Sequence, residues 1–266
     1  MSDDPKTLVA LNESFTAALE ESSNGRREQA VVHLRRIIAA RPDFLAARTS
    51  LATILILTGR SAEAVSELQA AVRDGFASPA MLAKLGAALD AAGRNREAID
   101  AFERAEQAGE RDPDLFNALG VAYARIGSRD EARRRFEQLL ALDPTAAGTW
   151  NNLGILEMEA HNRRAAVEAF RRAVAVDPQY GEAWRGLGAA LVDDERADAV
   201  RAWQRAVSLD PQDFDTLFNL ALVLAESPAP RDALPYLRRF AAEAPRDRYG
   251  TDLAKVTALI KKIETG

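Results

Sequence analysis

The chain lacks cysteine and has only two histidines among its 266 residues. Disulfide bonds, thiolate metal ligands and a cysteine nucleophile are therefore excluded. His33 and His161 lie far apart in the sequence, and neither has a Glu-x-x-His type neighbour that would complete a metal site. We accordingly expect no metal, no cofactor and no catalytic residues, and a protein that is not an enzyme.

Long apolar runs and an excess of positive charge are also missing. No stretch approaches the roughly 20 apolar residues that span a bilayer, and the acidic start of the chain lacks the basic flank and apolar core of a secretory signal. The formal net charge is -5, which disfavours extensive contact with nucleic acid because neutralising phosphates needs a positive excess. We expect a cytoplasmic protein that binds neither membranes nor nucleic acid.

Glycine and proline are too few for a disordered or collagen-like chain, and hydrophobic residues make up 47% of the sequence. What the sequence does contain is an internal repeat. Leucines recur at a spacing of 34 residues, with 33 for the last step: Leu51, Leu85, Leu119, Leu153, Leu187 and Leu220. A second series with the same period consists of Ala30, Ala64, Ala98, Ala132, Ala166, Ala199 and Ala233. Four residues after each alanine stands Leu, Phe or Trp.

Each repeat has the pattern of two helices. In 147–180, apolar residues follow helical spacing over two stretches of about 14 residues that are separated by 161–163. Proline ends the second stretch because it lacks the amide hydrogen and restricts the residue before it. Glycine follows four of the leucines directly, although glycine inside a helix costs about 1 kcal/mol relative to alanine. We expect that Gly154 and Ala166 let the two helices of a hairpin approach each other closely.

The pattern resembles a known family. Phe116-x-x-Leu119-Gly120-x-x-Tyr123, followed by Ala132-x-x-x-Phe136 and Pro144, is similar to the tetratricopeptide repeat. Trp150-x-x-Leu153-Gly154, Ala166-x-x-x-Phe170 and Pro178 fit the same pattern, with Glu157 in place of the tyrosine. The resemblance implies an all-α solenoid of antiparallel helix hairpins, wound as a right-handed superhelix whose first helices line a concave groove.

The spacing divides the chain into a repeat array with two flanking segments. Residues 1–10 are expected to form an N-terminal arm or an extension of the first helix, and 248–266 an amphipathic capping helix. The repeats are 11–44, 45–78, 79–112, 113–146, 147–180, 181–213 and 214–247.

The family resemblance also indicates which side chains line the groove. Positions 2, 5, 9, 12 and 13 of a repeat usually point into it, with position 6 close by. Asparagines at positions 5 and 6 stand out, because an amide with two donors and an acceptor can bind a peptide backbone of any sequence. The candidate binding residues are Asn117, Asn151, Asn152, Arg185, Asn219, Asp114, Glu182, Asp215 and Met158. We interpret the chain as a protein–protein interaction scaffold that binds an extended, basic or mixed-charge peptide segment.

Three alternatives stay open. The asparagines of the groove can instead hydrogen-bond neighbouring helices. The array can be a structural module that self-associates, giving a homo-oligomer. The register of Asp4-Pro5-Lys6 leading into 11–15 also resembles tetratricopeptide tails of bacterial enzymes such as sulfatases, which would make the chain an accessory module.

The triplet of Lys, Asn and Arg positions by which some family members grip a C-terminal carboxylate is not found in consecutive repeats.

Overall fold

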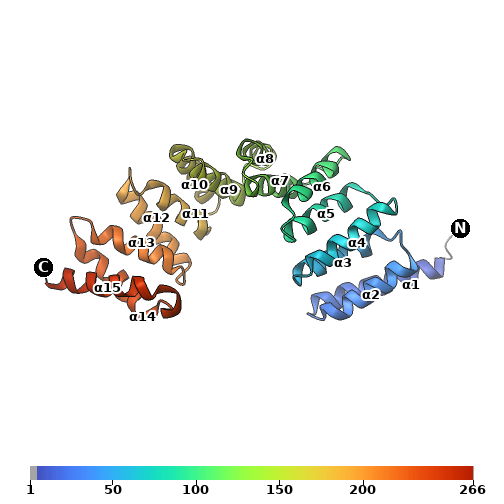
Figure 1. The fold of residues 1–266 in the computed structure, drawn as a ribbon, viewed down its shortest axis with the longest axis horizontal. Coiled ribbons are helices and arrows are strands. Elements are labelled where there is room, and N and C mark those ends of the chain that lie inside the picture. Colours follow the sequence, from blue (N-terminus) through green and yellow to red (C-terminus); the bar gives the residue numbers. More distant parts are fainter. Residues whose placement is uncertain (1–4, 266) are drawn as a thin grey trace. The chain divides into compact units, whose positions relative to one another are not determined.

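The computed structural model describes residues 5–265, in which every regular element is a helix (Figure 1). The chain divides into two compact units, one up to Gln138 and one from Leu139. The first part holds α1 (Pro5–Ser23), α2 (Arg27–Ala40), α3 (Leu45–Leu57), α4 (Ser61–Arg73), α5 (Pro79–Ala91), α6 (Asn95–Gln107) and α7 (Pro113–Arg125), and α8 (Arg129–Leu142) runs across the boundary. The second part holds α9 (Ala147–Glu159), α10 (Arg163–Val176), α11 (Gly181–Leu191), α12 (Arg196–Leu209), α13 (Phe214–Ala225), the short 3₁₀ helix η1 (Pro230–Ala233), α14 (Leu234–Glu243) and α15 (Arg246–Thr265).

Consecutive helices pack as hairpins within each unit (Figure 1). In the N-terminal unit the hairpins are α1–α2, α3–α4 and α5–α6, and each second helix also contacts the first helix of the next hairpin. The C-terminal unit repeats this arrangement with α9–α10, α11–α12 and α13–α14, after which α15 packs on α14. The prediction of an all-α solenoid of helix hairpins is confirmed. No helix in residues 5–265 is long and apolar enough to cross a membrane.

The recurring helix glycines make room for an aromatic ring, and this corrects our expectation of a close approach of two backbones. A Cβ atom added to Gly154 would lie 2.7 Å from the ring of Phe170, which projects from the second helix of the same hairpin. The same ring also lies against Gly186 of the next repeat, where an added Cβ would be 2.5 Å away. Phe170 is 1% exposed. Glycine is therefore required by a side chain of the facing helix.

The second-helix residue that faces this position depends on whether the position holds glycine or alanine. Where the first helix has glycine, the second helix has an aromatic residue, as in Gly86–Phe102, Gly120–Phe136, Gly154–Phe170 and Gly188–Trp203. Where the first helix has alanine, the second helix has leucine, as in Ala18–Leu34, Ala52–Leu68 and Ala221–Leu237. All seven of these second-helix side chains are buried. One methyl group on the first helix thus decides between a ring and a smaller branched side chain on the second.

Left-handed residues make the turns within the hairpins. Gly25, Gly59, Gly93 and Gly127 have φ between 75° and 80°, a conformation that costs glycine little because it has no Cβ. His161 takes the same place in the fifth repeat with φ 58°. Its turn is closed by backbone hydrogen bonds from His161 N to Met158 O (3.0 Å) and from Asn162 N to Glu157 O (2.8 Å).

The two flanking segments differ from the predicted bounds. Residues 5–10 belong to α1, so this part of the expected arm is an extension of the first helix, while 1–4 lie outside the described residues. The C-terminal helix α15 begins at Arg246, two residues before the predicted segment, and has a kink at Tyr249. Its buried residues Tyr249, Val256 and Ile263 belong to the same core cluster as Phe240 of α14.

We predict that Gly154→Ala lowers the free energy of unfolding by about 1–3 kcal/mol, because the new methyl group overlaps the Phe170 ring, which also lies against Gly186. Adding Phe170→Leu should restore part of the loss, since alanine faces leucine in three other hairpins. Urea denaturation of the two single variants and the double variant gives the coupling energy. Simply additive losses would contradict this account of the glycines.

We predict that His161→Gly raises the free energy of unfolding by about 0.5–1 kcal/mol, because relief of the left-handed strain exceeds the extra unfolded-state entropy of glycine. His161→Ala retains the Cβ atom and serves as the control, which should give no gain. Thermal and urea melts of the three proteins test this, and equal effects of Gly and Ala would show that the backbone conformation is not the cause.

Candidate functional site

The candidate groove residues all lie on first helices of hairpins. In the N-terminal unit, α7 carries Asp114, which is exposed, and Asn117, which is half-buried. In the C-terminal unit the other seven lie on α9 (Asn151, Asn152, Met158), α11 (Glu182, Arg185) and α13 (Asp215, Asn219). The helices α9 and α11 contact each other directly, so their side chains form a continuous surface.

Asn151 is buried, with 2% of its surface exposed. Its side chain is hydrogen-bonded to that of Tyr180, which lies in the junction before α11. The pKa of Tyr180 is raised, first by burial and then by the nearby charge and hydrogen bond of Glu182, while the bond with Asn151 acts in the opposite direction. Burial removes Asn151 from the side chains that a ligand can reach, which corrects our expectation. Its amide connects α9 to the next repeat.

Asp215 is also used within the chain. Arg248 of α15 donates from Nη2 to its Oδ2 at 2.6 Å, and the Tyr249 hydroxyl donates to its Oδ1 at 2.9 Å. The Arg248 guanidinium lies 4.9 Å from the centre of the Tyr249 ring. Both carboxylate oxygens thus have partners within the chain, although the side chain remains exposed. Its role is to hold the start of α15 against α13.

Arg185 keeps an accessible head group on α11. It forms a long ion pair of 3.4 Å with Asp213, and its backbone carbonyl accepts a hydrogen bond from Trp203 Nε1 at 3.2 Å. Asp213 is already occupied as the N-cap of α13, since its carboxylate accepts from the backbone N and the hydroxyl of Thr216. The guanidinium therefore has donors to spare, and exposed Glu182 lies on the same helix one turn earlier.

One exposed apolar residue escaped the sequence prediction. Ile155 on α9 is 45% exposed, and it lies one helical turn after Asn152 and one turn before half-buried Met158. It occupies position 9 of its repeat, which the family resemblance places in the groove, so the signal was present. We call the surface formed by Asn152, Ile155, Met158, Glu182 and Arg185 the α9–α11 face. It combines an amide, two apolar side chains, a carboxylate and a guanidinium, with exposed Asn219 on α13.

Other perturbed groups have structural roles. Burial, together with Glu103, raises the pKa of Tyr123 to about 12. The Tyr123 hydroxyl of α7 donates to Glu103 of α6 at 2.5 Å. Arg135 of α8 donates to Glu106, also on α6, at 2.8 Å. These contacts tie α6 to both α7 and α8. Within residues 5–265, no group of three or more His, Asp or Glu side chains is placed to hold a metal ion. The polar clusters that the structure shows join neighbouring helices.

Two sequence profiles, both described as tetratricopeptide repeat, match the chain. One covers residues 22–89, and the other covers 83–147, 118–160, 151–198 and 193–248. Together the two profiles span most of the sequence. No curated protein matches the chain significantly.

Solved structures share the fold at low sequence identity. The C-terminal part of a TPR repeat-containing protein from Cytophaga hutchinsonii is 14% identical, with a TM-score of 0.69 over 90% of this chain and 98% of that one. YrrB, described as a TPR protein with an unusual peptide-binding site, is 18% identical with a TM-score of 0.57, over 70% of this chain and 96% of its own. MamA from Desulfovibrio magneticus is 21% identical with a TM-score of 0.56, over 62% and 93%.

We predict that Asp215→Ala loosens α15, because the Tyr249 hydroxyl loses its acceptor and Arg248 its ion pair, at a cost of about 1 kcal/mol. Amide hydrogen exchange in α15 should become faster while α11 is unchanged. Asp247→Ala, which removes an exposed carboxylate from the first turn of α15, is the matched control. Unchanged exchange in α15 of the Asp215 variant would contradict the assigned role.

Proposed function

Because the chain belongs to the tetratricopeptide repeat family, whose members are typically non-enzymatic scaffolds for protein interactions, we propose that its α9–α11 face binds an extended segment of a partner protein. The observation that carries this proposal is the open, mixed surface of two adjoining first helices. Its apolar side chains, exposed Ile155 and half-buried Met158, stand on the same helix as Asn152, and exposed Glu182 and Arg185 lie on the adjoining helix.

The side chains indicate the chemistry of the segment. Burying Ile155 against an apolar residue of the partner supplies about 25 cal/mol for each Å² removed from water. Glu182 and Arg185 favour a segment that carries charges of both signs, because opposite charges fix the register and like charges are rejected. Asn152 supplies an amide for the backbone of the segment, and Asn219 extends the polar surface on α13.

The remaining candidates take revised parts in this proposal. Asn151 supports the face through Tyr180, whereas Asp215 holds the start of α15 against α13 and stays a candidate binding residue. Asp114 and Asn117 lie on α7 of the N-terminal unit. We propose that they form a separate contact with the partner segment. The peptide-binding site named for YrrB supports the choice of a peptide as ligand.

Selection of random peptides on the immobilised chain, followed by calorimetric titration of the selected sequences, tests the proposal. We predict that Ile155→Asp weakens the selected peptides at least about tenfold, since an apolar contact of about 1.5 kcal/mol or more is lost. Its melting temperature should stay unchanged, because Ile155 already faces solvent.

Arg185→Glu provides the second arm of this experiment. It should shift the selected peptides towards basic residues, whereas Arg164→Glu, on exposed α10 surface away from the face, should not. If the wild type and both α9–α11 variants select the same peptides with equal affinity, this face is not the binding site. A concentration-dependent dimer that Ile155→Asp abolishes would instead assign the face to self-association.

A further inference from the structure

The chain contains an example of how a carboxylate in the first turn of a first helix binds an arginine. Asp215 of α13 accepts a hydrogen bond from Arg248 Nη2 at 2.6 Å on one oxygen and from the Tyr249 hydroxyl at 2.9 Å on the other. The Arg248 guanidinium also lies over the Tyr249 ring, 4.9 Å from its centre, where a cation is attracted to the ring. An acid and a tyrosine together thus hold a guanidinium.

Glu182 holds the same position one repeat earlier. It is the second residue of its repeat and lies in the first turn of α11, as Asp215 does in α13. The Tyr180 hydroxyl is hydrogen-bonded to Glu182, so this carboxylate also has a tyrosine beside it. Among the side chains that the structure describes, no Lys or Arg forms an ion pair with Glu182. Arg185, one turn later, is paired with Asp213 instead. Glu182 and Tyr180 therefore form a site of the same kind without its guanidinium.

Tyr180 is held by both helices of the α9–α11 face. Its hydroxyl is also hydrogen-bonded to Asn151 of α9, and a Cβ atom added to Gly148 of the same helix would lie 3.9 Å from it. Burial and the nearby Glu182 carboxylate raise the pKa of Tyr180, so the phenol keeps the proton that it donates. Tyr180 is half-buried, which leaves part of its side chain accessible. The acid and the ring are thus positioned before a ligand arrives, which lowers the entropic cost of binding.

The tyrosine next to such an acid is particular to one repeat junction. Tyr180 ends the fifth repeat, and Glu182 is the second residue of the sixth. Asp114 holds the position of Glu182 in the fourth repeat, yet Asp112 stands where the tyrosine would be. The remaining repeats end in Phe44, Ser78, Ala146, Asp213 and Asp247. The junction before α11 therefore differs from the others in both members of the pair.

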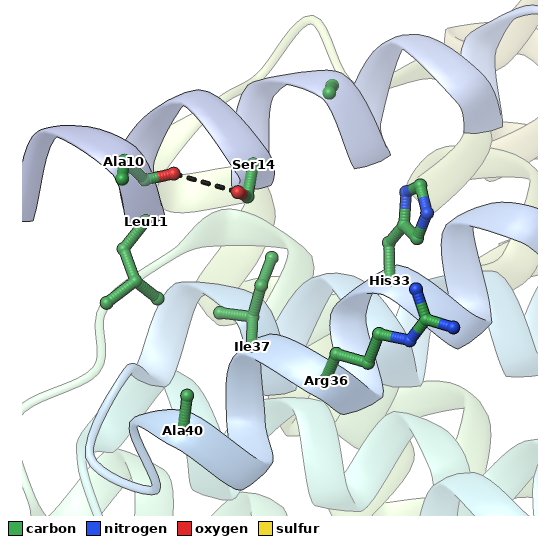
Figure 2. Close-up of a pocket in the computed structure, with 8 residues that line it drawn as sticks. Ala10, Leu11, Ser14, His33, Arg36, Ile37 and Ala40 are labelled. Atoms are coloured by element: carbon green, nitrogen blue, oxygen red, sulfur yellow. Dashed lines mark hydrogen bonds between the residues drawn. The ribbon is translucent and has the colours of Figure 1, made fainter. Parts of the chain in front are cut away.

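A cavity in the N-terminal unit has the opposite charge. It measures about 530 Å³ and lies between α1 and α2. Figure 2 shows His33 and Arg36 of α2 beside it, across from Ser14 of α1. The carboxylate of Glu21 already lies 3.0 Å from His33 Nδ1, whereas Arg36 always carries a positive charge. Because like charges reduce affinity, a basic ligand is directed away from this cavity and towards Glu182.

We propose that the partner segment carries an arginine whose guanidinium donates to Glu182 and lies over the ring of Tyr180, as Arg248 does at Asp215. This inference rests on the proposed function, since it names the residue that the segment places at the α11 end of the α9–α11 face. Arginine fits better than lysine, because a planar guanidinium can bind a carboxylate and stack on an aromatic ring at once. The pairing of Arg185 with Asp213 offsets the positive charge that would otherwise repel this arginine.

Random dodecapeptides selected on the immobilised full chain are the probe. Arginine should recur at one fixed position of the selected sequences. Replacing it with alanine should weaken binding about tenfold, because a hydrogen bond between two charged groups is lost. Replacing it with lysine should weaken binding about threefold, since the ammonium keeps the charge but loses the planar contact with the ring.

Glu182→Gln is the decisive variant. Selection on it should no longer enrich arginine, and it should bind the wild-type peptide and the alanine-substituted peptide with equal affinity, because both changes remove the same contact. Asp114→Asn is the matched control, since it neutralises an exposed acid at the same repeat position that has no tyrosine. It should leave the arginine preference and the affinity unchanged. Tyr180→Leu, checked for helicity by circular dichroism, should abolish the preference for arginine over lysine.

The variants separate this inference from the proposed function. If Ile155→Asp weakens the selected peptides but Glu182→Gln does not, the face binds a segment and the assignment of an arginine to Glu182 is overturned. If Glu182→Gln weakens them and Ile155→Asp does not, the arginine site stands and the rest of the α9–α11 face is not used. A selection that yields no binding peptide overturns both.

Discussion

The fold depends on how a second-helix side chain fits against the first helix of its own hairpin. Phe170 shows the constraint most fully, because its ring lies against both Gly154 and Gly186. The distance between helices cannot change without moving this ring, and close-packed interiors resist such movement. The spacing of the two helices in a hairpin and the stacking of this hairpin on the next both depend on this fit.

Much of the fold could be predicted, because a repeated sequence contains its own alignment. The 34-residue period, the two apolar stripes and the closing prolines indicated the hairpins, and the turn glycines indicated the left-handed positions. The reason for the helix glycines was predicted wrongly. The pairing of a first-helix glycine with a second-helix aromatic residue, and of alanine with leucine, was visible in the sequence. Only the structure shows that Gly154 and Phe170 touch.

The site was less predictable, because it depends on contacts with residues that the repeat motif does not specify. The spacing put Asn151 and Asp215 at groove positions. In the structure Asn151 is hydrogen-bonded to Tyr180, and Asp215 accepts hydrogen bonds from Arg248 and Tyr249. These partners come from a junction and from α15, where the period gives no guidance. Ile155 was missed for another reason, since position 9 was expected in the groove but polarity guided the choice of residues.

A ring shared by two hairpins also limits how the sequence can change in evolution. Because Phe170 rests on glycines of its own repeat and of the following one, any larger residue at Gly186 has to be matched by a change in the repeat before it. The energy that folds one hairpin and the energy that joins it to its neighbour therefore reside partly in the same atoms. Substitutions at the ring position of one repeat and at the glycine position of the next should therefore occur together. Replacing a single repeat by recombination would place its ring against a residue of the next repeat that does not fit it.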